Sequence, residues 1–64
     1  MQPHEQRVMD EQKELQIKLD ALNTFLCKGC PAFINQQNWE LLERQYNTMW
    51  LYNDILKQRI RLFE

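Results

Sequence analysis

The sequence predicts an all-α protein, an antiparallel two-helix hairpin with a short N-terminal extension that assembles as a helical homo-oligomer. Three observations lead to this prediction. The 64 residues include one Gly and two Pro, too few for a chain of short strands and turns. Apolar residues recur at helical spacing over two long segments. One break, near Gly29 and Pro31, separates these segments.

Length and composition indicate a single helical domain over residues 1–64. Hydrophobic residues make up 44% of the chain and charged residues 27%, which is typical of a folded protein. The net charge of −1 argues against DNA or RNA as a partner. No apolar run is long enough to span a membrane, and no signal peptide opens the chain, so we expect an intracellular protein without a membrane partner.

The first helix is expected over residues 3–27. Pro3 suits a first helical turn, and the carboxylate of Glu5 favours the positive end of the helix dipole. Lys28 and Gly29 are typical of a helix C-terminus, and Pro31 prevents simple continuation. The apolar stripe of this helix consists of Val8, Leu15, Leu19, Leu22 and Leu26, with Gln12 filling the gap.

The second helix is expected over residues 36–63, after a connector of residues 28–35. Asn35 and Asn38 are both good N-caps for it. Its stripe consists of Trp39, Leu42, Tyr46, Met49, Asn53, Leu56, Ile60 and Phe63. A second apolar set flanks the stripe and consists of Leu41, Trp50, Tyr52, Ile55 and Leu62. This helix is therefore apolar over most of its circumference.

The short connector predicts that the two helices fold back against each other. Pairing residues whose numbers sum to 64 or 65 brings the two stripes together and places Gln12 beside Asn53 as a buried amide pair that fixes the register. One partner helix covers only one stripe. The apolar residues left uncovered are Trp50, Tyr52, Ile55 and Leu62, together with Ile17 and Phe25. We interpret them as a homo-oligomer interface; the alternative is ordinary, singly exposed apolar residues.

The motif Cys27-Lys28-Gly29-Cys30 allows three readings. A redox CxxC normally opens a helix, where the dipole lowers the thiol pKa, whereas this one closes a helix. It supplies half of a tetrahedral zinc site. The cysteines are therefore two loop thiols, a zinc site shared between chains, or a labile disulfide.

Catalysis is not expected. The chain has one His and no Ser, and its carboxylates are spaced as solvated helix positions. We therefore predict a protein that is not an enzyme, with no catalytic residue, no metal site within one chain and no cofactor.

The open end of the hairpin gathers positive charge. Antiparallel geometry places His4 and Arg7 beside Arg59 and Arg61. The unpaired N–H groups of a helix N-terminus also favour an anion there. One interpretation is an anion site, and association of two chains through this end would double the positive charge around one ligand. The other interpretation is an ordinary solvated helix terminus.

Two stretches resemble one known family. The first comprises residues 4–8 with Glu11, Glu14, Leu15, Lys18, Leu19, Leu22, Phe25 and Leu26. The second comprises residues 40–42 with Gln45, Met49, Tyr52, Ile55, Leu56, Arg59 and Ile60. Together they are similar to the crAss-phage-related small helical proteins that include the phage anti-CBASS sponges, over about residues 4–62.

The resemblance implies a function and a set of site residues. Such sponges sequester cyclic di- and trinucleotide messengers of bacterial CBASS defence without cleaving them, as homo-hexamers with pockets between protomers. His4 matches the aromatic residue that stacks on a base, and Lys18 matches a lysine that meets phosphate. Arg59 resembles a separate cyclic-trinucleotide contact. With Arg7 at the same end as His4, these residues form the predicted ligand site.

We therefore expect a phage-encoded sponge that acts in the cytoplasm of the infected bacterial host. The alternative is a small helical oligomerisation or protein-interaction module that binds a protein through its wide apolar helix. Cyclic nucleotide binding distinguishes the two.

Overall fold

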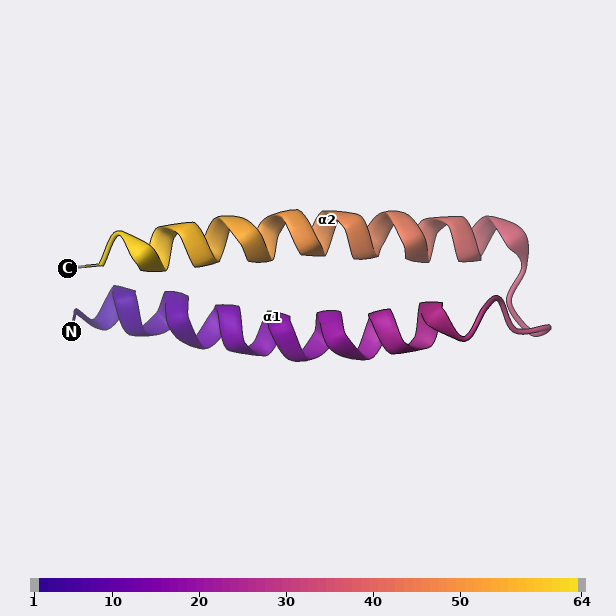
Figure 1. Cartoon of the computed structure of the whole chain (residues 1–64), viewed down its shortest axis with the longest axis horizontal. Helices are drawn as coiled ribbons and strands as arrows, with labels where there is room; N and C mark the ends of the chain where they lie inside the picture. The colour runs from indigo at the N-terminus through magenta and orange to yellow at the C-terminus, as the bar shows by residue number, and fades with distance from the viewer. Residues whose placement is uncertain (1, 64) are drawn as a thin grey trace.

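The computed structural model describes residues 2–63, and these form two α-helices and no strand. Helix α1 spans Pro3–Cys27 and helix α2 spans Gln36–Arg61. The helices lie side by side and antiparallel, so both chain ends lie at one end of a rod of 48 × 15 × 14 Å (Figure 1). Of the predicted two-residue N-terminal extension, Gln2 is described and Met1 lies outside the described residues.

The helix N-termini are capped as their sequences favour. The backbone N–H of Gln2 donates to Glu5 Oε1 at 2.9 Å, just before Pro3 starts α1. Asn35 is the N-cap of α2, because its Oδ1 accepts from the backbone N–H of Asn38 at 2.8 Å. Asn38, the alternative cap, therefore lies inside the helix.

Helix α2 ends at Arg61, two residues before the predicted end at residue 63. The prediction placed the end at about residue 63 because Phe63 continues the apolar stripe and Leu62 the flanking set, whereas their backbone N–H groups make a tighter turn. These groups donate to the carbonyls of Arg59 and Ile60, three residues back, at 3.1 and 3.0 Å. Such a closing turn satisfies the carbonyls that the last helical turn leaves free.

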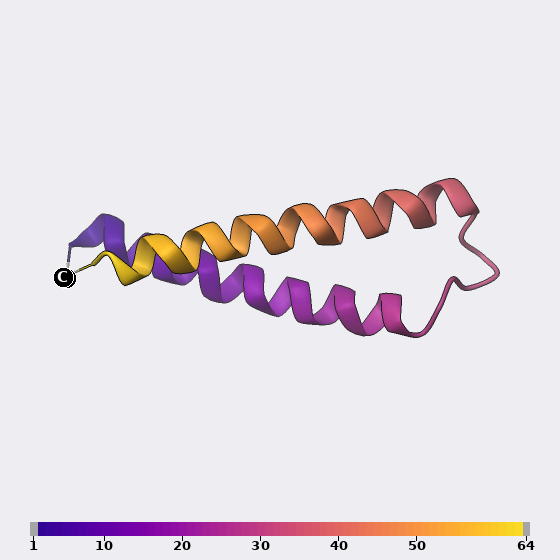
Figure 2. The ribbon, with the colours of Figure 1, turned by 45° about the horizontal axis from the view of Figure 1, so that its top comes forward.

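The connector of residues 28–35 reverses the chain (Figure 2). Lys28 and Gly29 donate their backbone N–H groups to the carbonyls of Phe25 and Leu26, which closes α1. Gly29 has a φ of +86°, a left-handed conformation that favours glycine at a helix end. Pro31 follows and accepts the backbone N–H of Ile34 at 3.1 Å.

A cluster of three amides sets the register of the two helices. Gln12 Nε2 donates to Asn53 Oδ1 at 3.1 Å, which confirms the predicted amide pair. Asn53 Nδ2 in turn donates to Gln16 Oε1 at 2.9 Å. Asn53 is only 4% exposed, and within residues 2–63 every buried side-chain nitrogen and oxygen has a hydrogen-bond partner.

The apolar core of the single hairpin is small. Its buried apolar side chains, within the described residues, are Val8, Leu19 and Leu56. Eight large apolar side chains are exposed, namely Ile17, Phe33, Leu41, Trp50, Leu51, Tyr52, Ile55 and Leu62. Neither described helix is long and apolar enough to cross a membrane.

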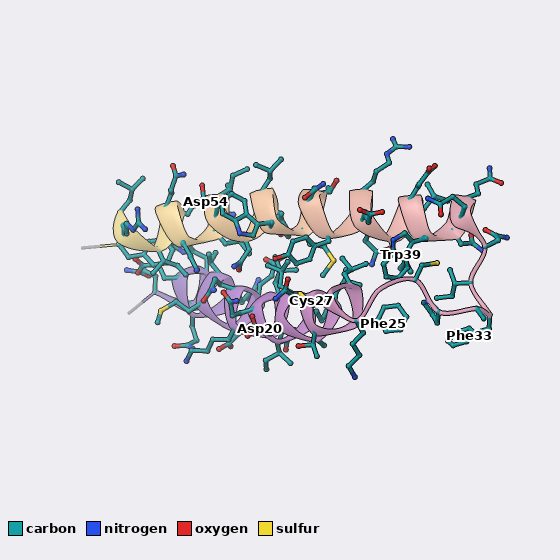
Figure 3. All side chains as sticks on the ribbon, turned by 45° about the vertical axis from the view of Figure 1, so that its right-hand side comes forward. Asp20, Phe25, Cys27, Phe33, Trp39 and Asp54 are labelled. Carbon is teal, nitrogen blue, oxygen red and sulfur yellow. The ribbon has the colours of Figure 1, made fainter. Side chains whose placement is uncertain are left out.

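Phe25 differs from its predicted exposure. We expected it to remain uncovered, but it is half-buried and packs against Trp39 with ring centroids 5.9 Å apart and planes tilted by 51°. Both residues lie next to the connector, where the end of α1 faces the start of α2 (Figure 3). The helix register that Gln12 and Asn53 set brings Phe25 and Trp39 together, so Phe25 is partly covered within its own chain.

Candidate ligand site

The open end of the hairpin brings three of the four predicted ligand residues to one region. His4 and Arg7 lie in the first two turns of α1, and Arg59 lies in the last turn of α2. Because the helices are antiparallel, these turns face each other. All three side chains are exposed. Each helix therefore contributes an exposed arginine to this end of the hairpin.

His4 is held by an aromatic contact at this end. Its ring meets Phe63 edge to face, with centroids 6.5 Å apart and planes at 81°. Such an edge-to-face contact favours one orientation of the imidazole. Phe63 was assigned to the packing stripe by its spacing, and the structure adds the role of supporting His4.

Lys18 lies apart from this group within one chain. It is exposed on α1, eleven residues beyond Arg7, which at 1.5 Å per residue is about 16 Å along the helix. A single chain thus offers a cationic end and a separate lysine. A compact ligand that meets both kinds of group requires a second chain.

A hydrogen-bonded pair joins the two helices near the cationic end. The Tyr52 hydroxyl donates to Glu11 Oε1 across the helices. This hydrogen bond is the main reason that the pKa of Tyr52 lies above its ordinary value of 10.0; burial and the Glu11 charge raise it further, whereas the Arg59 charge lowers it. Arg59 lies seven residues beyond Tyr52, two turns along the same face of α2, and Glu11 lies one turn beyond Arg7 on α1, so a carboxylate borders the cationic end.

The sequence reasoning missed Glu11 as part of this region. The predicted register pairs Glu11 with residues 53 and 54, so spacing alone does not place it against Tyr52; the contact depends on the side-chain rotamers. Tyr52 was expected to be left uncovered by its own chain, but its hydroxyl has a hydrogen-bond partner there. Its hydroxyl is bound to Glu11, although the residue as a whole remains 41% exposed.

The other predicted interface residues are open to solvent in the single hairpin. The exposed fractions are 52% for Trp50, 53% for Ile55 and 80% for Leu62. Trp50 and Ile55 lie in the middle and second half of α2, while Leu62 caps its C-terminus. These side chains are available to a second copy, and which residues such a copy would contact stays a prediction.

The two cysteines face different neighbours. Both are free and exposed. Cys27 Sγ lies 3.8 Å from Asn23 Oδ1 on α1, whereas Cys30 Sγ lies 3.4 Å from the carbonyl oxygen of Ile34 in the connector. The described part of the chain contains no group of three side chains that could hold a metal ion.

Comparison with known proteins identifies the family. The family model described as Sequestin matches residues 2–62, and the chain belongs to this family. The family name indicates a protein that sequesters a ligand rather than an enzyme, and it is consistent with the resemblance to phage anti-CBASS sponges. No match was found among curated proteins or among solved structures.

Proposed function

We propose that this Sequestin family member is a phage-encoded sponge for cyclic di- and trinucleotide immune messengers in the cytoplasm of the infected bacterial cell. The observation that carries the proposal is the family match over residues 2–62. A sponge needs no chemistry, only binding that is tight and slow to release. The proposal therefore requires groups that recognise phosphate and base, together with burial between chains.

The cationic end supplies groups of the required kind. Arg7 and Arg59 offer guanidinium groups, which bind phosphate through two parallel hydrogen bonds. The exposed His4 ring, which meets Phe63 edge to face, is the group on which we propose that a base stacks. We assign the trinucleotide contact to Arg59 and phosphate contact in the dinucleotide site to Lys18.

Assembly completes the site in this proposal. Arg7 and Lys18 are too far apart for one compact ligand within one chain, so two symmetry-related chains each provide a ring for one base and a cation for one phosphate. The exposed apolar residues of α2 supply the surface for association. A hexamer, as the resemblance implies, would place several such sites in one particle.

Calorimetry with a panel of ligands tests the proposal. The panel contains cyclic dinucleotides, cyclic trinucleotides and their linear counterparts. Wild-type protein should bind at least one cyclic ligand more tightly than its linear form. Lys18→Ala should weaken cyclic-dinucleotide binding by about 1.5–3 kcal/mol, the value of a charge-assisted contact. Lys13→Ala, which removes another lysine of α1, is the matched control and should change little.

A second candidate is a protein-interaction module. The exposed apolar side chains of α2 favour it, because a partner helix could cover them without any nucleotide. Absence of binding to every cyclic nucleotide by the assembled wild-type protein would replace the sponge proposal with this one. Equal affinities of the wild type and Lys18→Ala would remove only Lys18 from the site.

A further inference from the structure

A groove lies at the connector end of the hairpin, far from the cationic end. Its volume is about 380 Å³, within the range of small-ligand sites. The residues that line it are Phe33, Ile34, Asn38, Leu41, Leu42 and Gln45. The hairpin is 48 Å long, so no compact ligand spans both ends of one chain. The groove is therefore a feature separate from the proposed phosphate contacts.

The fold builds the groove from two elements. Asn38, Leu41, Leu42 and Gln45 follow the spacing of three, four and seven residues that lines one face of a helix. The cap of Asn35 on Asn38 fixes where this face begins. Phe33 comes from the connector at the tip of the hairpin, beyond the Phe25–Trp39 pair (Figure 3). The result is an aliphatic floor with an amide at each end and an aromatic ring at the side.

Two amide groups in the groove are free to recognise a ligand. The backbone N–H of Asn38 is used by the cap, whereas its side-chain amide makes no hydrogen bond within residues 2–63. Gln45 Nε2 makes a weak contact of 3.7 Å to Met49 Sδ, which leaves the Gln45 carbonyl oxygen as an acceptor. The Phe33 ring is 83% exposed and offers its faces for stacking.

The chemistry of the lining selects a class of ligand. None of the six lining side chains is charged, so a phosphate would find no cation in the groove. A purely apolar ligand would bury both amides without partners, which is unfavourable. A flat heteroaromatic ring with donors and acceptors on its edge satisfies the aliphatic floor, the Phe33 ring and the amides together. Asn and Gln amides pair with the adenine edge, which has one donor and one acceptor.

We propose that this groove is a second binding site, which takes the adenine ring of a nucleoside or nucleotide. The inference goes beyond the proposed function, because it requires no phosphate and uses none of the cationic residues. The proposal commits to adenine stacked on Phe33, with its edge on the amide of Gln45 or Asn38.

Titration of ¹⁵N-labelled protein with adenosine tests the groove without any phosphate. Backbone amide signals of residues 33–45 should shift on binding. Phe33→Ala and Gln45→Leu should each weaken adenosine binding by about tenfold, the loss of one stacking or amide contact. Asn47→Ala removes an exposed amide of α2 that does not line the groove and is the matched control for Gln45→Leu. Arg59→Ala should bind adenosine like the wild type.

Three outcomes would overturn the inference. In the first, millimolar adenosine does not shift the amide signals of the groove residues. In the second, Phe33→Ala and Gln45→Leu both bind adenosine as tightly as the wild type does. The third is dilution of the protein alone shifting the same signals, which would show that a second copy fills the groove. Because adenosine lacks phosphate, failure here leaves cyclic-nucleotide binding at the cationic end unaffected, and failure at that end leaves adenosine binding unaffected.

Discussion

The most constrained residue of the hairpin is a polar one. Asn53 is 4% exposed and exchanges hydrogen bonds with Gln12 and Gln16 on the opposite helix. A buried amide is costly unless it is paired, and a shift of one helix along the other would break both bonds at once. With so few buried apolar side chains in the single chain, this cluster does more to specify the register than aliphatic packing does.

Replacing Asn53 tests this role. Asn53→Leu should lower the free energy of unfolding by about 1–3 kcal/mol, because Gln12 and Gln16 lose their cross-helix partner and keep hydrogen bonds only within α1. The triple variant with Leu at positions 12, 16 and 53 should lose less, since no amide is then left unpaired. Urea unfolding followed by circular dichroism measures both. A triple variant less stable than the single one would contradict the role of the cluster.

Tyr52 predicts a loss of stability at alkaline pH. Its pKa is raised in the folded chain, chiefly by the hydrogen bond to Glu11, so folding favours the protonated phenol. The stabilisation is complete below the ordinary pKa of 10.0 and is lost as the pH rises through the higher folded value. Tyr52→Phe lacks the phenol hydroxyl, so its stability should not contain this pH-dependent contribution.

Thermal unfolding of the wild type and of Tyr52→Phe between pH 8 and about pH 11 measures the effect. The difference in stability between the two proteins should be constant up to about pH 9 and should shrink above about pH 10. Comparing the two proteins at each pH cancels the titration of the lysines. A difference that is independent of pH would show that the Glu11–Tyr52 bond does not act on stability.

Glu11 also affects the cationic end. Its carboxylate accepts the hydrogen bond of Tyr52 one helical turn beyond Arg7, and we expect this negative charge to reduce the attraction of the cationic end for phosphate. Glu11→Gln keeps an acceptor for Tyr52 and removes the charge. It should tighten the binding of a phosphate-bearing cyclic ligand severalfold at low salt and less at high salt. Calorimetry at two salt concentrations measures this, with Glu14→Gln as a control on the same helix.

At the scale of the elements, the two ends of α2 differ in how well sequence predicts them. Asn35 is a strong N-cap with a side-chain bond to Asn38, and the helix starts where this chemistry predicts. The C-terminal end was predicted two residues late. Leu62 fits the flanking apolar set and Phe63 fits the stripe equally well inside or outside the helix, and only their backbone hydrogen bonds decide the end.

The Asn35 cap can be tested directly. Asn35→Ala removes the acceptor for the Asn38 N–H and should cost about 0.5–2 kcal/mol of stability. It should also loosen the first turn of α2, and therefore the groove. Asn47→Ala, an exposed residue in the middle of α2, is the matched control and should change stability little. Thermal unfolding measures both variants; equal stability would show that the cap contributes nothing.

Sequence periodicity predicts the pairing of the helices but not every cross-helix contact. The stripe and the short connector are enough to place Gln12 beside Asn53. The diagonal bonds from Asn53 to Gln16 and from Tyr52 to Glu11 depend on the rotamers of long side chains, which spacing does not fix. For the same reason, residue spacing places His4, Arg7 and Arg59 at one end of the hairpin but does not fix the directions of their side chains.

At the scale of the whole molecule, the hairpin is incomplete as a single chain. Three apolar side chains are buried and eight large ones are exposed within the described residues. The sequence predicts this excess because α2 carries two apolar sets and α1 can cover only one. It does not predict what covers the second set, since an unpaired apolar face is compatible with several symmetries.

The final prediction concerns this second set. Ile55 is 53% exposed in the second half of α2, and a charged side chain there would face the partner in any assembly that covers the set. Ile55→Asp should therefore shift the mass measured by light scattering to that of a single chain and lower the unfolding temperature, since the hairpin core alone is marginal. Asn47→Asp places the same charge on an exposed polar position of α2 and should leave the mass unchanged.

Dilution of the wild-type protein gives an independent measurement of the same coupling. If folding and assembly are linked, the unfolding temperature must rise with protein concentration, because the assembled state binds further copies and the unfolded chain does not. Ile55→Asp should abolish this dependence. A wild-type unfolding temperature that is independent of concentration, together with an unchanged mass for Ile55→Asp, would show that the exposed face of α2 is not a contact between copies and would favour a different protein as its partner.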